Sequence, residues 1–371
     1  MNPDNIKNCF TAWLKKECVL VIATLCAAIS SIFASPQAGY IDFKVLILLF
    51  NLMLIVAAFK QLSLLDFAAI SIIKKCSSSR SLYFAMTAIT FMSSMLVTND
   101  VALITFVPLT LIIAQKVRIN ALNLIVIQTL AANLGSSLTP VGNPQNLFIY
   151  SFYDMDIVNF FEITLPLVLV STLLLLILIL REKNHPLELE IKQVKIESMP
   201  KTVVYAALFA TVLMSVFHVI PYTTSAAAVW ACVLFLDREL FAKVDYSLLL
   251  TFVAFFIFIG NISNMQGISG LMKSFLDTGR NTFLAGLISS QFISNVPAAI
   301  LISNFTPYYR ELIMGVNIGG MGTLIASLAS VISYKLYVQQ YPAKHYMRIF
   351  SLYNTAGLLL MVPFAMWLIG S

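Results

Sequence analysis

The sequence predicts an all-α polytopic membrane protein built from two inverted-topology repeats, and three observations carry this prediction. Of its 371 residues, 59% are apolar and only 11% are charged, whereas soluble domains are about 45–50% apolar and about 25% charged. A soluble protein of this size could not bury so much apolar surface. The chain is long enough for about ten spans of ~20 residues each. The order of its apolar windows, finally, repeats once along the chain.

The formal charge of +6 raises the alternative of a nucleic-acid partner, and the positions of the basic residues argue against it. When loops are placed by hydropathy, nearly all lysines and arginines fall on one side. The exceptions are Lys44, Lys273, Arg280 and Arg310. Such a bias is typical of cytoplasmic loops. We therefore expect a cell-membrane protein with a cytoplasmic N-terminus that contacts the lipid bilayer and no nucleic acid.

The N-terminal segment allows two interpretations. Lys15 and Lys16 precede an apolar run that ends near Ala34, which resembles a signal peptide with its small residues at a cleavage site. We favour a retained first span, because cleavage would remove from the first repeat a helix that the second repeat has. The five cysteines are odd in number and lack metal-type spacing, so we interpret them as packing residues.

The first predicted repeat covers residues 1–180. In order, it holds two spans, an amphipathic interfacial helix, a re-entrant hairpin with a polar tip, a broken span and a final span: 18–34, 42–59, 61–75, 81–115, 121–150 and 157–180. A re-entrant hairpin is expected where an apolar stretch has a polar centre and returns to its starting side. The amphipathic segment suits a helix that lies along the interface.

A charged cytoplasmic linker and a connecting span, together residues 181–222, separate this repeat from its copy. The single span at 202–218 inverts the membrane orientation of the second copy. The second repeat, residues 223–371, has the same order of elements: 223–236, 246–260, 263–278, a hairpin at 281–309, a broken span at 311–338, and 348–369. The total is nine full spans, two hairpins and two interfacial helices. The first hairpin is expected to open from the cytoplasm and the second from outside.

Polar residues at membrane depth pair between the copies. The first hairpin tip reads Thr98-Asn99-Asp100 and the second Ser294-Asn295-Val296, followed by Pro297, which aligns Asn99 with Asn295 at an offset of 196. The broken spans align at an offset of 184. There Asn133, Gly135 and Thr139 match Asn317, Gly319 and Thr323.

Broken helices at this depth indicate a binding site. Pro140 and Pro144 lack amide donors and glycine permits unusual backbone angles, so polar backbone groups are freed where lipid offers no partners. The ends of the half-helices can then bind ions. The neutral oxygens of Asn99 and Asn295 are of the kind that replace the hydration shell of sodium. Two tips facing two broken helices form an inverted-repeat transporter site.

Asp100 is the only carboxylate that we place well inside the apolar core, where a charge costs about 2.5–3.5 kcal/mol. One interpretation is a helix cap: Thr98, Asn99 or Asp100 could satisfy the first amides of the returning helix, as Asn295 could near Pro297. The other is a coupling role, as a sodium ligand or a group that takes up a proton.

These tips and breaks resemble the ion transporter superfamily, which includes arsenite permeases, sodium–proton antiporters, divalent anion/sodium symporters and citrate transporters. The stretches VTNDVALITFVPLTLI, NLGSSLTPVGNPQNL, SNVPAAILIS and NIGGMGTLIASLAS carry the resemblance. The most similar subgroup is the uncharacterised anion permeases of the arsenite-permease branch. The resemblance implies a homodimer, a scaffold domain, a transport domain that moves like an elevator, and sites at both hairpin tips.

In the dicarboxylate symporters of this superfamily each tip reads Ser-Asn-Thr, and the threonines help to hold substrate carboxylates. Here Asp100 and Val296 stand in their places. This departure argues against a dicarboxylate substrate and leaves the asparagines in place. The Asn-Asp pair at the first tip is more similar to the arsenite-permease branch.

We therefore expect a cation-coupled secondary transporter of a small anion, oxyanion or carboxylate, with sodium or a proton as the coupling ion. Residues expected to serve the coupling ion are Thr98, Asn99, Asp100, Gly135, Ser294, Asn295 and Gly319, with sodium at Asn99 and Asn295. Residues expected to contact substrate are Ser136, Thr139, Pro140, Gly142, Asn143, Val296, Pro297, Asn317, Thr323 and Ser327.

Three alternatives stay open. A sodium–proton antiporter would need only a lone acid and neutral oxygens. A passive channel is disfavoured because hairpins closed by helix tips suit alternating access better than a continuous pore. An intramembrane enzyme is disfavoured because the chain has no His-Glu-x-x-His run, no Gly-x-Ser-x-Gly elbow and no second deep aspartate. No cofactor other than the coupling ion is expected.

Overall fold

The computed structural model describes residues 17–117, 119–187 and 193–370, and over these ranges the chain is helical with no β-strand. The first half contains α2 Cys18–Phe33, η1 Ala38–Tyr40, α3 Phe43–Gln61, α4 Leu64–Ile73, α5 Ser79–Val97, α6 Asn99–Val117, α7 Ala121–Gly135, η2 Ser136–Leu138, α8 Pro144–Phe152 and α9 Ile157–Leu180. The second half contains α10 Met199–Val216, α11 Tyr222–Leu236, η3 Arg238–Lys243, α12 Tyr246–Ser263, α13 Gln266–Phe275, α14 Gly279–Ile293, α15 Asn295–Ser303, α16 Tyr309–Gly319, η4 Leu324–Ala326, α17 Leu328–Val338 and α18 Ala343–Gly370.

The chain is a multi-pass membrane protein by the length and hydropathy of its helices. Among the described residues, eight segments are long and apolar enough to cross a bilayer: α3, α5, α6, α7 extended to Leu138, α9, α10, α12 and α18. Two of them, α5 and α6, are the arms of the first predicted hairpin, each 19 residues long. Large apolar side chains such as Phe235 and Ile32 are 85% and 78% exposed, as expected for a surface that faces lipid.

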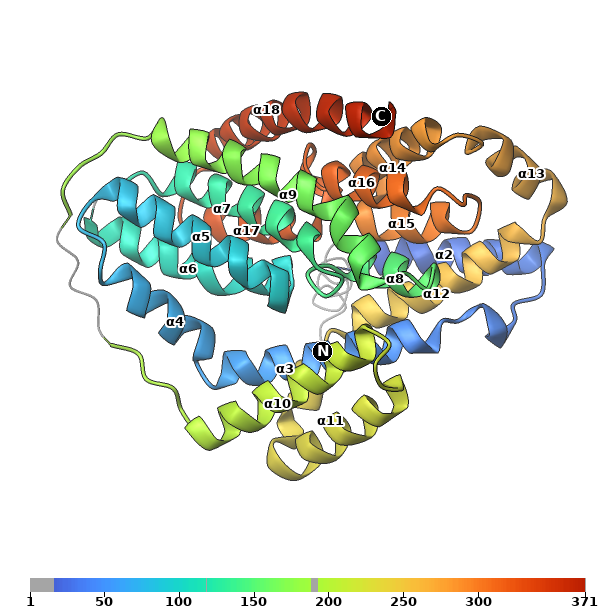
Figure 1. Cartoon of the computed structure of the whole chain (residues 1–371), viewed down its shortest axis with the longest axis horizontal. Helices are drawn as coiled ribbons and strands as arrows, with labels where there is room; N and C mark the ends of the chain where they lie inside the picture. Colours follow the sequence, from blue (N-terminus) through green and yellow to red (C-terminus); the bar gives the residue numbers. More distant parts are fainter. Residues whose placement is uncertain (1–16, 118, 188–192, 371) are drawn as a thin grey trace, which may run out of the picture.

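The two halves approach one another from opposite ends of the molecule. In Figure 1 the hairpin α5/α6 enters from the left and the hairpin α14/α15 from the right, and their turns lie near the middle. The short helices α4 and α13, which precede the hairpins, lie at the left and right ends. We call these two ends of the molecule the α4 end and the α13 end. The predicted fold class, with inverted repeats, hairpins and broken helices, is confirmed.

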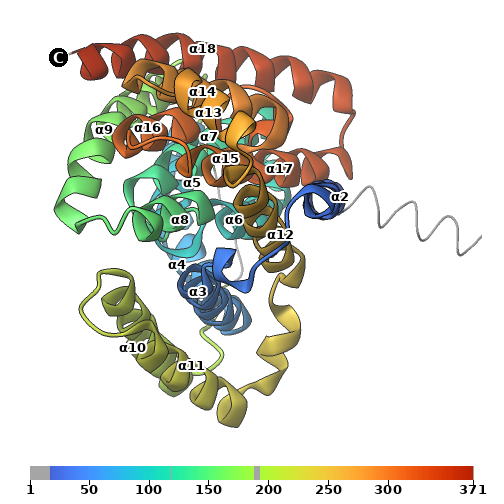
Figure 2. The same ribbon diagram turned by 90° about the vertical axis from the view of Figure 1, so that its right-hand side faces the viewer.

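Packing between the halves is reciprocal. Helix α2 packs against α12, and α11, the corresponding helix of the second half, packs against α3. Helix α5 packs against α7 as α14 packs against α16. Helix α10 has no counterpart in this scheme and lies beside α11 beyond α3, away from the hairpins (Figure 2).

Local signals explain where the two matching helices α3 and α12 begin. The carboxylate of Asp42 accepts a hydrogen bond from the amide of Val45 at 3.0 Å. The carboxylate of Asp245 accepts one from the amide of Leu248, also at 3.0 Å. Aspartate is a favoured N-cap because its oxygen satisfies a helix amide that has no partner within the helix. The two caps are 203 residues apart, which extends the internal alignment beyond the hairpins.

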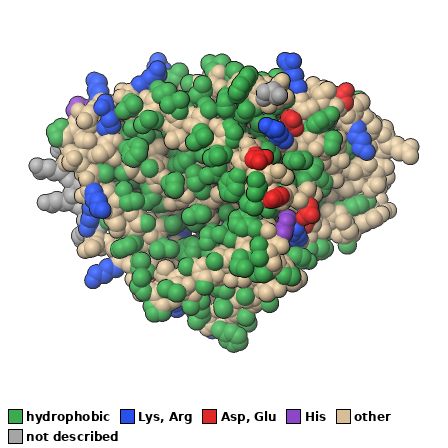
Figure 3. Space-filling view, viewed as in Figure 1, with side chains coloured by type: hydrophobic (Ala, Val, Ile, Leu, Met, Phe, Trp, Pro, Cys, Tyr) green, Lys and Arg blue, Asp and Glu red, His purple; other side chains and the backbone are tan. Residues whose placement is uncertain are grey.

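The outer surface of the molecule is largely apolar. In Figure 3 hydrophobic side chains cover most of the visible face, and lysines and arginines gather mainly toward its edges. Charged side chains at the edges and apolar ones between them suit a molecule that is surrounded by a bilayer.

Some predictions fall on residues outside the described ranges. They concern the side of the membrane on which the N-terminus lies, with Lys7, Lys15 and Lys16, and the loop residues Arg118 and Lys192. The residue limits of the two repeats also stay a prediction.

Candidate functional site

Both hairpin tips have the same unusual backbone. Thr98 connects α5 to α6 with φ 70° and ψ 151°, and Ser294 connects α14 to α15 with φ 73° and ψ 157°. A positive φ in a residue with a side chain is strained and is kept where the surrounding structure requires it. Because the two residues are 196 apart, the turns are structurally equivalent.

The broken spans lie beside these tips. Helix α7 ends at Gly135, a short 3-10 turn follows, and the chain is extended at Thr139 and Asn143 before α8 begins with Pro144 in its first turn. Helix α16 ends at Gly319, and α17 begins after η4 and an extended Ser327. Proline suits the first helical turn, where an amide would have no partner. The sequence therefore places each break where the backbone can unwind.

Glycine is required where each broken span meets its hairpin. A β-carbon at Gly135 would lie 2.5 Å from the carbonyl oxygen of Phe91 and 2.8 Å from Oγ of Ser94. At Gly319 it would lie 2.9 Å from Oγ of Ser290. Separations below about 3 Å would force backbone shifts. Gly135 and Gly319 thus let α7 and α16 approach the entering arms of the hairpins.

A threonine in each break holds the hairpin end. Thr139 donates its hydroxyl proton to the carbonyl oxygen of Met95, and Thr323 donates to that of Gln291 at 2.8 Å. Residues 95 and 291 are 196 apart, as the tips are. Thr139 and Thr323 therefore position the hairpin ends, because both hydroxyl protons are bonded to backbone. Their contact with substrate stays a prediction.

Asparagines connect the first tip to both breaks. Asn99 donates from Nδ2 to Oδ1 of Asn133 at 3.0 Å, and the hydroxyl of Ser327 donates to the same oxygen at 2.9 Å. Asn99 Oδ1 accepts from the amide of Asp100 at 2.9 Å. The backbone amide of Asn99 donates to the carbonyl oxygen of Gly142 at 3.2 Å. Both asparagine side chains are buried, so the tip is fixed in a water-poor environment.

Within the first break, side chains replace lost helical hydrogen bonds. Asn146 donates to the carbonyl oxygens of Ser136, Ser137 and Thr139 at 3.2, 3.4 and 3.3 Å. Asn143 donates from Nδ2 to the hydroxyl of Ser136. The carbonyls of an unwound segment would otherwise lack partners.

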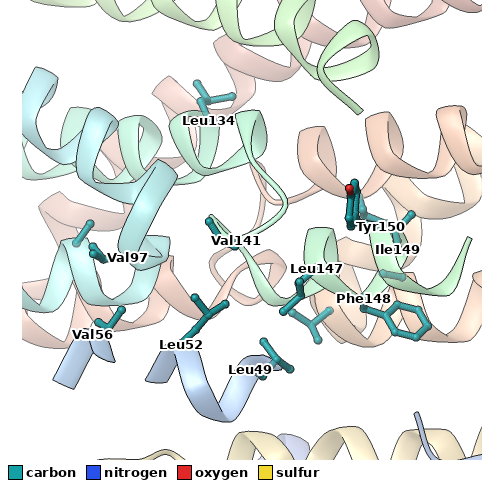
Figure 4. Close-up of a cluster of buried hydrophobic side chains, with 14 of the residues drawn as sticks. Leu49, Leu52, Val56, Val97, Leu134, Val141, Leu147, Phe148, Ile149 and Tyr150 are labelled. Atoms are coloured by element: carbon teal, nitrogen blue, oxygen red, sulfur yellow. The ribbon is translucent and has the colours of Figure 1, made fainter. Parts of the chain in front are cut away.

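A cavity of about 500 Å3 lies between α3 and the first tip. Figure 4 shows Leu49, Leu52 and Val56 of α3 on one side, with Val97, Val141 and Leu147 opposite. Among its polar lining residues are Thr98, Asp100 and Asn143 at its depth, and Lys60, Gln61, Lys243 and Asp245. The last four are exposed, so they mark the mouth of the cavity.

Two groups inside the cavity are without partners among the described residues. No hydrogen bond or ion pair from that part of the chain reaches the carboxylate of Asp100. Asn143 is 2% exposed, and its Oδ1 has no hydrogen-bond partner there. A buried oxygen without a partner costs about 1–3 kcal/mol, and a solute with a donor or a cation would satisfy it. Glycine at 142 also matters here, because a β-carbon would overlap the carbonyl of Ser136.

The structure thus separates the predicted site residues into three groups. Thr98, Asp100 and Asn143 line the cavity. Ser294, Asn295, Val296 and Pro297 are buried at the second tip, where Ser294 donates to Oδ1 of Asn295 at 3.3 Å. The remaining predicted residues lie in the breaks or are hydrogen-bonded to them: Asn99, Gly135, Ser136, Thr139, Pro140, Gly142, Asn317, Gly319, Thr323 and Ser327.

Sequence reasoning missed the mouth of the cavity. The hydropathy pattern places Lys60, Lys243 and Asp245 in ordinary loops, yet all three line the cavity. Only the alignment of Asp42 with Asp245 as helix caps could have singled out this region. Asn146 was missed as well, although its position in an interrupted apolar span was a usable signal.

Comparison with known proteins adds independent findings. Residues 11–307 match the citrate transporter family. An uncharacterized transporter of Methanocaldococcus jannaschii is 33% identical over 303 residues, which cover 80% of this chain and 81% of that protein. The inner membrane protein YbiR of Escherichia coli is 30% identical over 302 residues, 80% of each chain. The crystal structure of the Alcanivorax borkumensis YdaH transporter has a similar fold, with TM-score 0.54 and 14% identity over 99% of this chain and 90% of its own.

Proposed function

Because this chain belongs to the citrate transporter family and is a transporter rather than an enzyme, we propose that it moves a small anion, an oxyanion or a carboxylate, in symport with sodium or protons. The observation that carries this proposal is the cavity beside the first hairpin tip. It joins an exposed mouth to the half-buried carboxylate of Asp100 and to the buried amide oxygen of Asn143.

The anionic substrate is supported by the positive groups of the cavity. Lys60 and Lys243 stand at the mouth, where two cations raise the local concentration of anions. Deeper in the cavity, α8 begins at Pro144 next to Asn143. The N-terminus of a helix carries partial positive charge and free amides, which favour an anion.

Cation coupling is supported by Asp100. Its carboxylate lines the cavity beside Thr98, and a lone carboxylate at this depth is unfavourable unless a cation or a proton accompanies it. Next to it, Oδ1 of Asn99 accepts one hydrogen bond from the described residues, that of the Asp100 amide, and an amide oxygen has a second lone pair for a cation. A sodium ion or proton at Asp100 would neutralise the tip so that an anion could occupy the same cavity. Asn295 would offer the equivalent oxygen at the second tip.

The arrangement of the helices supports alternating access of the elevator type. We assign α2, α3 and α10 to α13 to the scaffold, and the hairpins with the broken helices to the moving part. The cavity lies on the boundary, since it is lined by α3 and by the first tip. The basic bias supports a cytoplasmic α4 end, and in this proposal the open cavity corresponds to the inward-facing state. A homodimer through the scaffold completes the proposal.

Uptake into proteoliposomes tests the function. Vesicles that contain the purified protein receive external citrate, arsenite or sulfate under an imposed sodium or proton gradient, and accumulation is measured with and without the gradient. Asp100→Asn should abolish or reshape the cation dependence while the protein remains folded. Uptake of each anion that is the same with and without gradients, and the same in Asp100→Asn, would reject the proposal.

A sodium–proton antiporter is the second candidate, and the two carboxylates of the cavity favour it. Asp100 and Asp245 line the same space, and an exchanger of cations needs only such groups. Proton movement reported by a dye on addition of sodium, in the absence of any anion other than chloride, would favour the antiporter.

A further inference from the structure

A second pocket lies at the start of α3, whereas the first cavity reaches the end of that helix. The second pocket has a volume of about 400 Å3 and is lined by the α2–α3 connection, α8, α12 and the end of α15. Among its lining residues are Tyr40, Asp42, Phe148, Phe256, Ile259 and Gly260. Three other lining residues, Gly39, Phe152 and Asn304, are exposed, so this pocket also has a mouth. It is not part of the site described above.

The second pocket is the internal counterpart of the first cavity. The caps Asp42 and Asp245 are 203 residues apart. The same offset relates the α12 residues that line the pocket to α3 residues that line the cavity. Phe256, Ile259 and Gly260 correspond in this way to Met53, Val56 and Ala57. The offset of 184 that relates the broken spans brings Phe148 onto Ile332, another residue of the cavity.

A hydrogen bond lies at the mouth of each space, and the two bonds are related by the offset of 203 residues. At the first cavity, Lys243 donates from Nζ to Oε1 of Gln61 at 2.6 Å. At the second pocket, Asn264 donates from Nδ2 to the hydroxyl oxygen of Tyr40 at 2.9 Å. Tyr40 is 203 residues before Lys243, and Gln61 is 203 residues before Asn264. Each bond connects a residue shortly before a helix cap to the end of the matching helix of the other half.

The two spaces differ in how far they reach. The first cavity extends to Thr98 and Asp100 of its hairpin tip. The second pocket does not include Ser294 or Asn295 of the other tip. Instead, α15 packs against α12, which closes the path at the position where the first cavity is open.

In the second pocket the ring of Tyr40 packs against Gly260 of α12. A β-carbon at Gly260 would overlap the ring of Tyr40, so the ring lies directly on the backbone of α12. At the corresponding position of α3 stands Ala57, which lines an open cavity. Asn264, one turn after Gly260, holds the hydroxyl of Tyr40 and also donates to the carbonyl oxygen of Gly260 at 2.9 Å.

We propose that the 400 Å3 pocket is the outward-facing half of the substrate path, closed toward the second hairpin tip, and that Tyr40, seated on Gly260 and held by Asn264, is the gate that holds it in this form while the first cavity is open. This inference rests on the proposed alternating access. In the outward-facing state Tyr40 leaves Gly260, the second pocket extends to Ser294 and Asn295, and the first cavity closes around Val56. The same small anion then enters or leaves beside aromatic side chains rather than lysines.

Cysteine accessibility tests the gate without any substrate. In a chain whose five cysteines are replaced by serine, Ile259→Cys reports on the pocket and Val56→Cys on the cavity. The probe is a thiol reagent that does not cross membranes, added to either side of proteoliposomes of known orientation. Tyr40→Ala should raise labelling at position 259 about tenfold and lower labelling at position 56 to a similar extent. Asn264→Ala and Tyr40→Phe should shift both in the same directions by less.

Glycine and alanine swaps provide a matched pair of controls. Gly260→Ala should displace the ring and open the pocket as Tyr40→Ala does, whereas Ala57→Gly, its counterpart in α3, should leave position 259 unlabelled. Unchanged labelling at position 259 in every variant would overturn the proposal. So would a rise at 259 without a fall at 56, because it indicates local loosening only. Reciprocal labelling in a chain that transports no anion or cation would contradict the proposed function and leave the gate supported.

Discussion

The side-chain amides of Asn133 and Asn317 cross between the two halves of the molecule in opposite directions. Asn133, in the first broken span, donates to the hydroxyl of Ser330 in the second at 3.2 Å. Asn317, in the second, donates to Oδ1 of Asn146 in the first at 2.7 Å. Both donors and both acceptors are related by the offset of 184 residues. The two breaks are therefore joined by a symmetric pair of buried hydrogen bonds.

Loss of these bonds should destabilise the protein unequally. Asn317→Ala leaves Oδ1 of Asn146 buried without that donor, at a cost of about 1–3 kcal/mol. Asn133→Ala should cost more, because Asn133 also accepts from Asn99 and Ser327. Thermal unfolding in detergent measures the difference. As the control, Asn281→Ala removes an amide that bonds to the surface residue Asp277 and should have no effect. Equal melting temperatures for all three variants would contradict a contribution of these two hydrogen bonds to stability.

Alanine at either close-approach glycine should separate a hairpin from its broken span. Gly135→Ala and Gly319→Ala introduce β-carbons within 3 Å of Ser94 and Ser290, and overpacking of this kind costs about 1–3 kcal/mol. Gly267→Ala is the matched control, since no atom lies within 4 Å of a β-carbon there. We expect lower melting temperatures for the first two variants and no decrease for the third. A decrease of the same size at Gly267 would show that the loss does not come from these close contacts, since alanine favours a helix more than glycine does.

Much of this arrangement could be predicted from the sequence, because the bilayer imposes strong local rules. Interruptions of apolar windows by glycine, proline and asparagine have few interpretations at membrane depth. That is why both hairpin tips and both breaks could be predicted near Thr98, Ser294, Gly135 and Gly319. The spacing of these signals also predicts the repeat.

The cavity and its mouth could not be predicted in the same way. Lys60 and Lys243 are far apart in sequence and meet only because η3 packs against α3. The difference between the open cavity and the closed pocket is not local either. The two halves share their pattern, and under the proposed alternating access the half that opens is set by a small free-energy difference between two packings of the same helices.

His218 should make stability depend on pH. Its ring stacks on Tyr150, Nε2 lies 3.1 Å from Nζ of Lys44, and Nδ1 lies 3.7 Å from the carboxylate of Asp154. Partial burial, followed by the nearby Lys44, lowers the pKa of His218 from 6.5, and Asp154 opposes this shift. The unfolded chain therefore takes up the proton first as the pH falls. Above pH 6.5 the residue contributes no pH dependence, and below it the folded state loses stability.

The measurement is the melting temperature between pH 7.5 and 5.5. Wild-type protein should lose more of its thermal stability over this range than His218→Gln, which keeps a polar side chain without the titration. The contact involves the loop after α10, the first turn of α3 and the turn after α8, so the variant also reports on their docking. Parallel pH profiles for the wild type and the variant would show that His218 has the same pKa in the folded and the unfolded protein.

Lys60 and Lys243 should make the cavity selective for anionic reagents. With Val56→Cys as the reporter, a negatively charged thiosulfonate should react faster than a positively charged one of similar size, because cations at the mouth concentrate anions. Lys60→Gln and Lys243→Gln should each lower this preference roughly two- to fivefold, and Asp245→Asn, at the same mouth, should raise it. The preference should also weaken as salt is added. Lys116→Gln, a lysine of α6 that does not line the cavity, is the control. If none of the three mouth variants altered the preference, the selectivity would belong to the interior of the cavity, at the N-terminus of α8. That result would contradict a role of the two lysines in attracting the substrate.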